Sequence, residues 1–130
     1  MRIELFTLCE GAFNTNGRLT IVNTFEDIVS EKFPWRGQLG LALKILFPHE
    51  ESGGFDILVR IKPAGDAKPL HEIKGHLEIK HNGGGKDVRL AMCTNIQGVA
   101  LNNPGDYEVV VLVNDNVLQA YPFKALVKHE

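Results

Sequence analysis

Apolar and polar residues alternate along most of this chain with a period of two. In residues 39–47, 55–61 and 107–113 every odd position is apolar or aromatic, whereas in 88–96 the even positions are mainly apolar. This alternation is typical of a β-strand that buries one face, because successive side chains point to opposite sides. We therefore predict half-buried strands at 39–47, 55–62, 73–80, 88–97 and 107–113.

Three further strands complete the expected set. Two of them open the chain, at 2–8 and 18–29, and the segment between them contains Asn16-Gly17, a strong turn signal. A last strand, at 117–127, contains Pro122. Proline has no N–H to give to a strand ladder, so we place this strand at a sheet edge or expect a bulge there.

The fold class follows from this set of strands. No helical period separates them, and the connecting segments are rich in glycine, proline, asparagine and aspartate, which favour turns. Runs of strands without helices are typical of two antiparallel sheets packed face to face. We predict an all-β, single-domain antiparallel β-sandwich of about eight strands spanning residues 1–130.

The segment LNNPGDY at 101–107 resembles the corner that begins a late strand of immunoglobulin- and fibronectin-like sandwiches. In such a corner a tyrosine turns its hydroxyl back onto upstream backbone while its ring joins the core. Tyr107 takes that place here, and Pro104 and Gly105 shape the turn. We interpret this loop as architecture rather than as a functional site.

Longer segments resemble one family. These are ELFTLCEGAFNTNGRLTIVNTFEDIVSEKFP near the start, LALKILFPHEESGGFDILVRI in the middle and PGDYEVVVLVNDNVLQAYPF near the end. Together they are similar to a family of small bacterial proteins that is known as a domain of unknown function. The shared pattern is strand alternation with a few fixed turns. The resemblance implies a bacterial protein with a sandwich fold, and it implies no activity.

Charge and composition narrow the partners. The formal net charge is −2, and acidic and basic residues are interspersed. Surfaces for nucleic acid or anionic membranes need clustered lysine and arginine, so we expect neither partner. No segment approaches the ~18 apolar residues of a membrane helix, and the opening residues do not resemble a secretory signal. We therefore expect a cytoplasmic protein with Cys9 and Cys93 as free thiols.

Three histidines recur every five residues, at His71, His76 and His81. Side chains alternate across a strand, so His76 faces away from the other two, which would lie roughly 33 Å apart. A metal ion holds its ligands at ~2 Å, and we expect no metal here. The NGGGK segment at 82–86 lacks the serine or threonine and the helix of a phosphate-binding loop, and we expect no cofactor.

An enzyme is the alternative interpretation. Its site would be assembled from loops at one end of the sandwich, with Glu51, His49 or His81, and Cys93 as acid, base or nucleophile. No spacing in the sequence supports that site, and the acidic residues between 50 and 56 match no calcium loop. We predict no catalytic residue and favour a non-catalytic protein.

The least ordinary feature is a set of apolar residues on the outward-facing positions of the predicted strands. If the strands are neighbours, these residues form an exposed stripe, and such stripes usually mark association surfaces. The alternatives are that other segments cover the stripe or that a bulge reverses the two faces. We predict a protein-binding module, a homodimer or a complex with another protein, whose contact residues are Leu46, Leu58, Val110 and Leu112.

Overall fold

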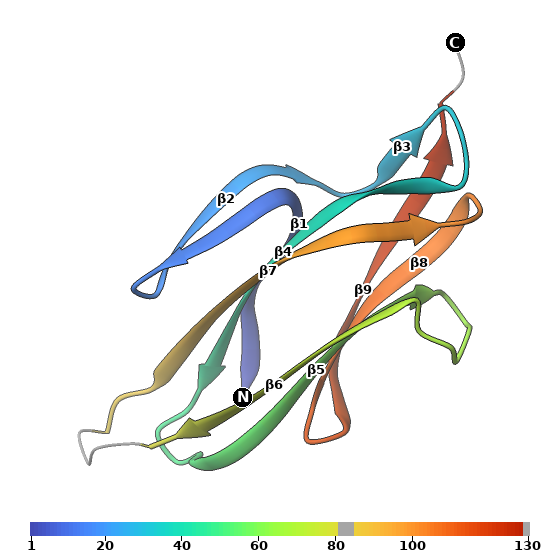
Figure 1. Ribbon diagram of the computed structural model, residues 1–130. Coiled ribbons are helices and arrows are strands. Elements are labelled where there is room, and N and C mark those ends of the chain that lie inside the picture. The colour runs from blue at the N-terminus through green and yellow to red at the C-terminus, as the bar shows by residue number, and fades with distance from the viewer. Residues whose placement is uncertain (81–84, 129–130) are drawn as a thin grey trace.

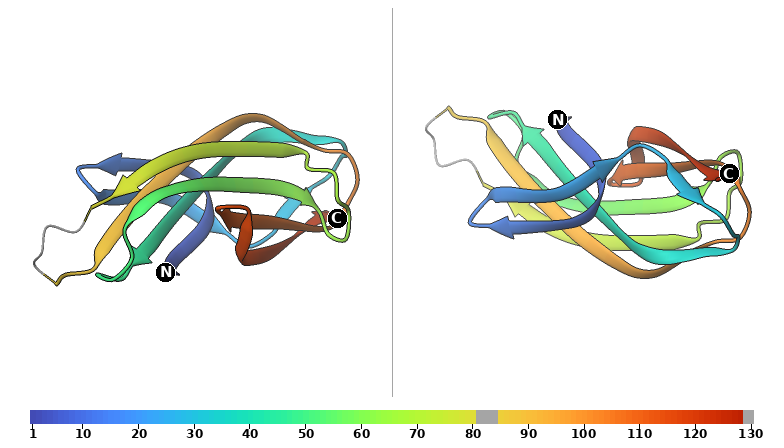
Figure 2. Two further views of the ribbon diagram at one scale, coloured as in Figure 1. Left: turned by 90° about the horizontal axis from the view of Figure 1, so that it is seen from below. Right: turned by 90° about the horizontal axis from the view of Figure 1, so that it is seen from above.

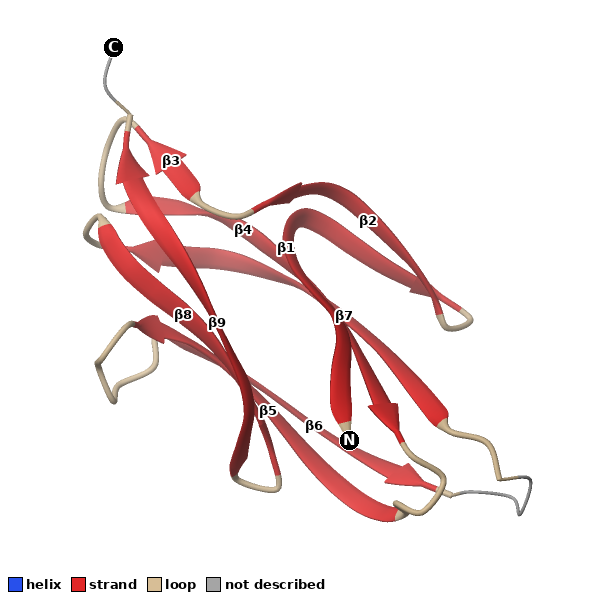
Figure 3. Ribbon diagram, turned by 180° about the vertical axis from the view of Figure 1, so that it is seen from behind, coloured by secondary structure: helices blue, strands red, loops and turns tan. Residues whose placement is uncertain are grey.

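The computed structural model describes residues 1–80 and 85–128, which form strands joined by turns and loops (Figure 3). The strands are β1 (Arg2–Thr15), β2 (Arg18–Phe25), β3 (Ile28–Ser30), β4 (Trp35–Phe47), β5 (Gly53–Pro63), β6 (His71–Ile79), β7 (Val88–Leu101), β8 (Gly105–Val113) and β9 (Asn116–Val127). The all-β prediction is confirmed. Across the described residues there is no helix that could cross a membrane.

The strands form two sheets (Figure 1). Sheet A has four strands in the order β2-β1-β4-β7, and sheet B has five in the order β3-β9-β8-β5-β6. The arrangement is sandwich-like, and sheet B is curled like half a barrel (Figure 2). The neighbours β4 and β7 and the neighbours β5 and β8 pair antiparallel, as predicted.

The residues predicted to face inward fill the space between the sheets. Their apolar side chains leave water together, which stabilises the fold by roughly 1.5–3 kcal/mol for each large buried side chain. The fully buried members of this main core include Leu39, Leu43, Ile45, Phe47, Ile57, Ile61, Leu101, Val109 and Val111. The alternation therefore identified the core correctly in these strands.

The predicted strand at 18–29 is instead two strands in two sheets. β2 ends at Phe25 and pairs with β1, whereas β3 begins at Ile28 and runs parallel to β9. Asp27, between them, accepts a hydrogen bond from the backbone N–H of Lys124 at 3.0 Å. The predicted single strand was wrong here because no glycine or proline marks the crossing. The described residues therefore form nine strands instead of about eight, and β3 and β9 pair parallel.

Two local features reverse or extend the predicted pattern. Gly98 has φ +70°, and the pairing of β4 with β7 shifts by one residue there, so the buried positions of β7 change from even to odd after Ile96. The first strand continues beyond its predicted end at residue 8 as far as Thr15. The turn that follows contains Asn16 and Gly17, both with positive φ, which confirms the turn signal.

Pro122 lies on an open edge, as predicted. β9 is paired along one side with β8, while β3 reaches only Ala125–Val127 on the other side. The N–H of Lys124 points away from β8 toward Asp27. Backbone N–H groups alternate in direction along a strand, so the nitrogen of Pro122 also points away from β8, and the ladder loses no hydrogen bond.

The far part of the β1–β2 hairpin bends over the neighbouring strands of its own sheet A, where it contacts β7. The hairpin also projects from one side of the molecule (Figures 1 and 2). The side-chain amide of Asn95 on β7 exchanges two hydrogen bonds of 2.9 Å with the backbone of Ala12. Asn14 donates a further bond of 3.0 Å to the carbonyl of Ala91. Beneath the hairpin lies a second, smaller apolar cluster built from Cys9, Ala12, Ala42, Leu19, Ile21 and Cys93.

The corner before β8 has the predicted contact. The hydroxyl of Tyr107 donates to the carbonyl oxygen of Asn103 at 2.6 Å, and its ring lies 5.5 Å from the ring of Phe123 in the core. Gly105 has φ +147°, a conformation that L side chains rarely adopt. The loop therefore holds the start of β8 in place.

Candidate functional site

The outer face of sheet B collects three of the four predicted contact residues. Leu58 on β5 lies directly opposite Leu112 on β8, and Val110 lies opposite Arg60 on the same pair of strands. On its other side Leu58 faces Lys74 of β6. These positions point away from the main core, because Ile57 and Val59, on the alternate parity, belong to it.

Leu46 does not join this group. It lies on β4, in sheet A, and its neighbours across the strands are Arg2 and Arg89. Its side chain is only 5% exposed. All four residues are at outward-facing positions, but they do not belong to one sheet. Sheet membership depends on pairing between distant strands, which the alternation of residues does not reveal.

The floor of the sheet B face is less exposed than a free strand surface. Val110 and Leu112 are each 7% exposed, whereas Leu58 is half-buried. Leu58 lies in a cleft of about 560 Å³. The polar residues that line this cleft are Asp56, Arg60, Glu72, Lys74, His76 and Asp115.

Ion pairs fix several of the polar side chains that line this cleft. Arg60 Nε lies 3.2 Å from Glu72 Oε1. The ring of His76 lies between two carboxylates, with Nδ1 2.6 Å from Asp56 Oδ1 and Nε2 2.9 Å from Glu78 Oε1. Hydrogen bonds to Asp56 and then to Glu78 raise the pKa of His76, because both favour the imidazolium. This set of charged side chains was not predicted from the sequence, although charged and histidine residues at every second position of β6 were a signal for it.

The comparisons with known proteins decide the family. A family model described as a family of unknown function, DUF6941, matches residues 4–126. The chain belongs to this family. The resemblance noted in the sequence to a domain of unknown function is confirmed to that extent.

Curated proteins and solved structures add little about this DUF6941 chain. No curated protein matches it. Among solved structures it is similar, at 13% identity and a TM-score of 0.45, to the Pseudomonas fluorescens alkylpurine DNA glycosylase AlkC bound to DNA containing an abasic site analog. The match covers 94% of this chain and 30% of that one. A likeness at this level carries no functional argument.

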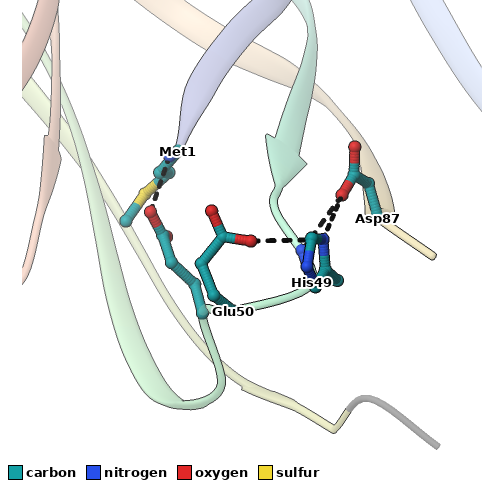
Figure 4. Close-up of polar contacts among 5 residues, drawn as sticks. Met1, His49, Glu50 and Asp87 are labelled. Atoms are coloured by element: carbon teal, nitrogen blue, oxygen red, sulfur yellow. Dashed lines mark hydrogen bonds and ion pairs between the residues drawn. The ribbon is translucent and has the colours of Figure 1, made fainter. Parts of the chain in front are cut away.

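A second polar group lies at the turn after β4 (Figure 4). His49 Nδ1 is 3.2 Å from Glu50 Oε2 and 3.6 Å from Asp87 Oδ1. The amino group of Met1 lies 2.7 Å from Glu51 Oε1. These contacts connect three segments of the DUF6941 chain at one end of the sandwich.

The enzymatic alternative would require Cys93 to meet His49 and Glu51, and the structure keeps them apart. Cys93 is paired with Ala42 on β4, seven residues before His49. The strand from Ala42 to Phe47 spans roughly 17 Å, and His49 lies beyond the end of β4. His81, the other base considered, lies outside the described residues.

Both cysteines of this DUF6941 chain are free thiols, as predicted. Cys9, on β1 of the hairpin, is fully buried, and its Sγ lies 3.3 Å from the carbonyl oxygen of Gly11. Burial raises the pKa of the Cys9 thiol, so the thiolate that would act as a nucleophile is disfavoured. Cys93 belongs to the same apolar cluster, and the two residues pack the hairpin onto sheet A.

No group of three or more histidine, cysteine, aspartate or glutamate side chains within residues 1–80 and 85–128 could hold a metal ion. His71 and His76 lie at opposite parities of β6. The glycine-rich segment considered as a phosphate loop lies mostly outside the described residues. The outer face of sheet B, with Leu58 in its cleft, is therefore the candidate site.

Proposed function

We propose that this protein is a non-catalytic interaction module that binds a second copy of itself through the outer face of sheet B. The observation that carries the proposal is the position of Leu58, half-buried in a cleft that charged side chains surround. Protein interfaces have this anatomy, with an apolar centre that is desolvated on binding and a polar rim.

The charges around Leu58 favour a second copy as the partner. A two-fold interface brings the same patch of both subunits together, so the patch must complement itself. Here cations such as Arg60 and Lys74 alternate with anions such as Glu72 and Asp115 around the cleft. A face with one sign of charge would repel its copy, whereas this face offers partners of both signs.

The test is light scattering after size exclusion across a dilution series. We expect a monomer–dimer equilibrium, and Leu58→Asp should raise the dissociation constant at least about tenfold, because truncation of a central contact typically costs more than 1 kcal/mol. Phe13→Asp is the matched control, since Phe13 is 56% exposed on the hairpin, away from this face. It should leave the equilibrium unchanged.

Two results would contradict the proposal. One is a wild-type protein that stays monomeric at the highest soluble concentration. The other is a Leu58→Asp variant that folds, as shown by an unchanged near-UV spectrum, and dimerises like the wild type. If Leu58→Asp fails to fold, Lys74→Glu tests the rim instead, because it replaces one of the cations beside Leu58.

The proposal also covers the domain organisation, the fold type and the cellular location of this protein. We infer one domain over residues 1–130, related to immunoglobulin- and fibronectin-like sandwiches, and the bond from Tyr107 to Asn103 supports that relationship. The free thiols of Cys9 and Cys93 support a reducing compartment such as the bacterial cytoplasm. The net charge of −2 supports a protein partner over nucleic acid or a membrane.

A further inference from the structure

A groove of about 780 Å³ lies beside the open edge of β9. It is bounded by β1, by the crossing between β2 and β3, and by the first residues of β8. Figure 3 shows β9 and β1 on the near side of the molecule, with the crossing between β2 and β3 level with the bend at the top of β1. The groove is separate from the cleft around Leu58, since the two share no lining residue.

One wall of the groove is aromatic. The rings of Phe6 and Tyr121 stack with their centroids 3.7 Å apart and their planes 9° apart, and Phe25 lies at the groove as well. All three side chains are only half-buried, so they leave aromatic surface open to a ligand. Burial raises the pKa of Tyr121, which keeps its ring a neutral phenol.

The described rim of the groove carries more carboxylates than cations. Among the described residues, none of the carboxylates of Glu26, Asp27 and Asp106 forms an ion pair. A fourth carboxylate at the groove, Glu108, is neutralised by Lys62 at 2.6 Å. The cation on the lining is Lys124, which lies opposite Asp106 across the pairing of β8 with β9. The backbone N–H of Lys124 donates to Asp27 and fixes that side chain beside the groove.

We propose that this groove binds an organic cation with a planar or apolar body, for which a guanidinium group is the best match. A guanidinium plane stacks on aromatic faces, and its edge donates to carboxylates in a forked geometry. The aromatic wall and the carboxylate rim supply both halves of that recognition. A backbone strand is a poorer occupant, because Pro122 interrupts the row of N–H donors along this edge.

The affinity expected from these contacts is modest. A cation above an aromatic ring and an exposed ion pair each contribute only a small favourable free energy of binding. A single guanidinium should therefore bind with a dissociation constant on the order of millimolar, and binding should weaken as salt screens the carboxylates.

The experiment is an NMR titration of the whole chain with N-acetylarginine amide. The neutral isostere N-acetylcitrulline amide keeps the shape and removes the charge. We expect saturable shifts at residues 25–27, 106 and 121–124 with the arginine compound, and at least about fivefold weaker binding of the citrulline compound. Absence of saturable shifts in these segments, or equal binding of the two compounds, would overturn the proposal.

Variants locate the site and test its chemistry. Glu26→Gln together with Asp106→Asn should weaken binding of the arginine compound at least about fivefold. Glu31→Gln removes an exposed carboxylate that does not line the groove, and it should change nothing. Phe6→Leu should also weaken binding by removing the stacked ring. Unchanged affinity in the double variant would overturn the assignment of the rim, even if Phe6→Leu failed to fold.

The ligand can come from a protein or from a metabolite, and one comparison separates the two. If a short peptide with a central arginine binds more tightly than free agmatine, the source is a peptide segment. If agmatine binds at least as tightly, the source is a small molecule. In either case the binding must weaken at least about fivefold in the Glu26→Gln, Asp106→Asn variant for the proposal to stand.

Discussion

The outer faces of both sheets carry apolar side chains, but the two faces are covered to different extents. On sheet A the residues Ala42 and Cys93 pack against Cys9 and Ala12 of the β1–β2 hairpin and form a second apolar cluster. On sheet B Val110 and Leu112 are also buried, at 7% exposure each, whereas Leu58 is half-buried in a cleft bordered by ion-paired side chains. One face is closed by the hairpin, and the other keeps Leu58 partly accessible.

The size of the side chains explains the difference. The covered face of sheet A has small residues. Gly40 lies so close to β1 that even a Cβ atom would not fit between them. Small residues allow a hairpin to approach a sheet closely. The open face uses larger aliphatic residues and surrounds them with long charged chains, whose stems shield apolar surface while their heads remain in water.

The largest effect should come from adding one methyl group to the covered face. A Cβ at Gly40 would lie 2.8 Å from the carbonyl oxygen of Cys9 and 3.0 Å from the nitrogen of Gly11, and backbone atoms cannot move aside cheaply. We expect Gly40→Ala to lower the free energy of unfolding by about 1–3 kcal/mol, measured by urea denaturation.

The matched control for this prediction lies in sheet B. Gly75 also stands inside a strand, in β6, and a Cβ there would meet nothing within 4 Å. Gly75→Ala should leave stability within about 0.5 kcal/mol or raise it slightly, because alanine restricts the unfolded chain. Equal losses in the two variants would contradict the close packing of the hairpin on sheet A.

A smaller effect is expected from the hydrogen bonds that hold the hairpin. Asn95→Ala removes both bonds to the backbone of Ala12, and it should cost about 1–2 kcal/mol. Hydrogen exchange should rise mainly in residues 11–22. Gln97 lies on the same strand as Asn95, and Gln97→Ala removes an exposed bond to Gln38 on β4. This variant should change the free energy of unfolding by no more than about 0.5 kcal/mol. Uniform exchange changes across both sheets would argue against local release of the hairpin.

Most strands of this fold could be predicted from the sequence, because burial of one face imposes a period of two. The segment around 18–29 could not, since no glycine or proline marks the crossing at Glu26 and Asp27, where the chain changes sheets. The reversal at Gly98 was equally hidden. A bulge changes which face is buried without changing the composition of the strand.

The candidate site was predicted only in part. Outward parity identified Leu58, Val110 and Leu112, but it also included Leu46, which lies in sheet A. Strand order decides which outward residues meet, and pairing between distant segments leaves no local signature. The groove beside β9 was missed for the same reason, since Phe6 and Tyr121 are brought together from opposite ends of the chain.

The smallest effect concerns His76 on the open face, and its sign can be derived. The two flanking carboxylates raise the pKa of His76 in the folded state above its ordinary value of 6.5. The folded protein therefore binds this proton more tightly than the unfolded chain does. The resulting stabilisation is fully present below about pH 6.5 and is lost as the pH rises through the folded pKa.

The measurement compares the stability of wild type and His76→Gln at pH 5.5 and at pH 8.5. The wild type should have the larger advantage at pH 5.5, and the difference should be small because the ion pairs are exposed to solvent. His71→Gln is the control, because His71 forms no ion pair in the described part of the chain. An advantage that grew toward pH 8.5 would mean that the carboxylates of Asp56 and Glu78 do not stabilise the imidazolium. The open face would then lack the charged frame that distinguishes it from the covered one.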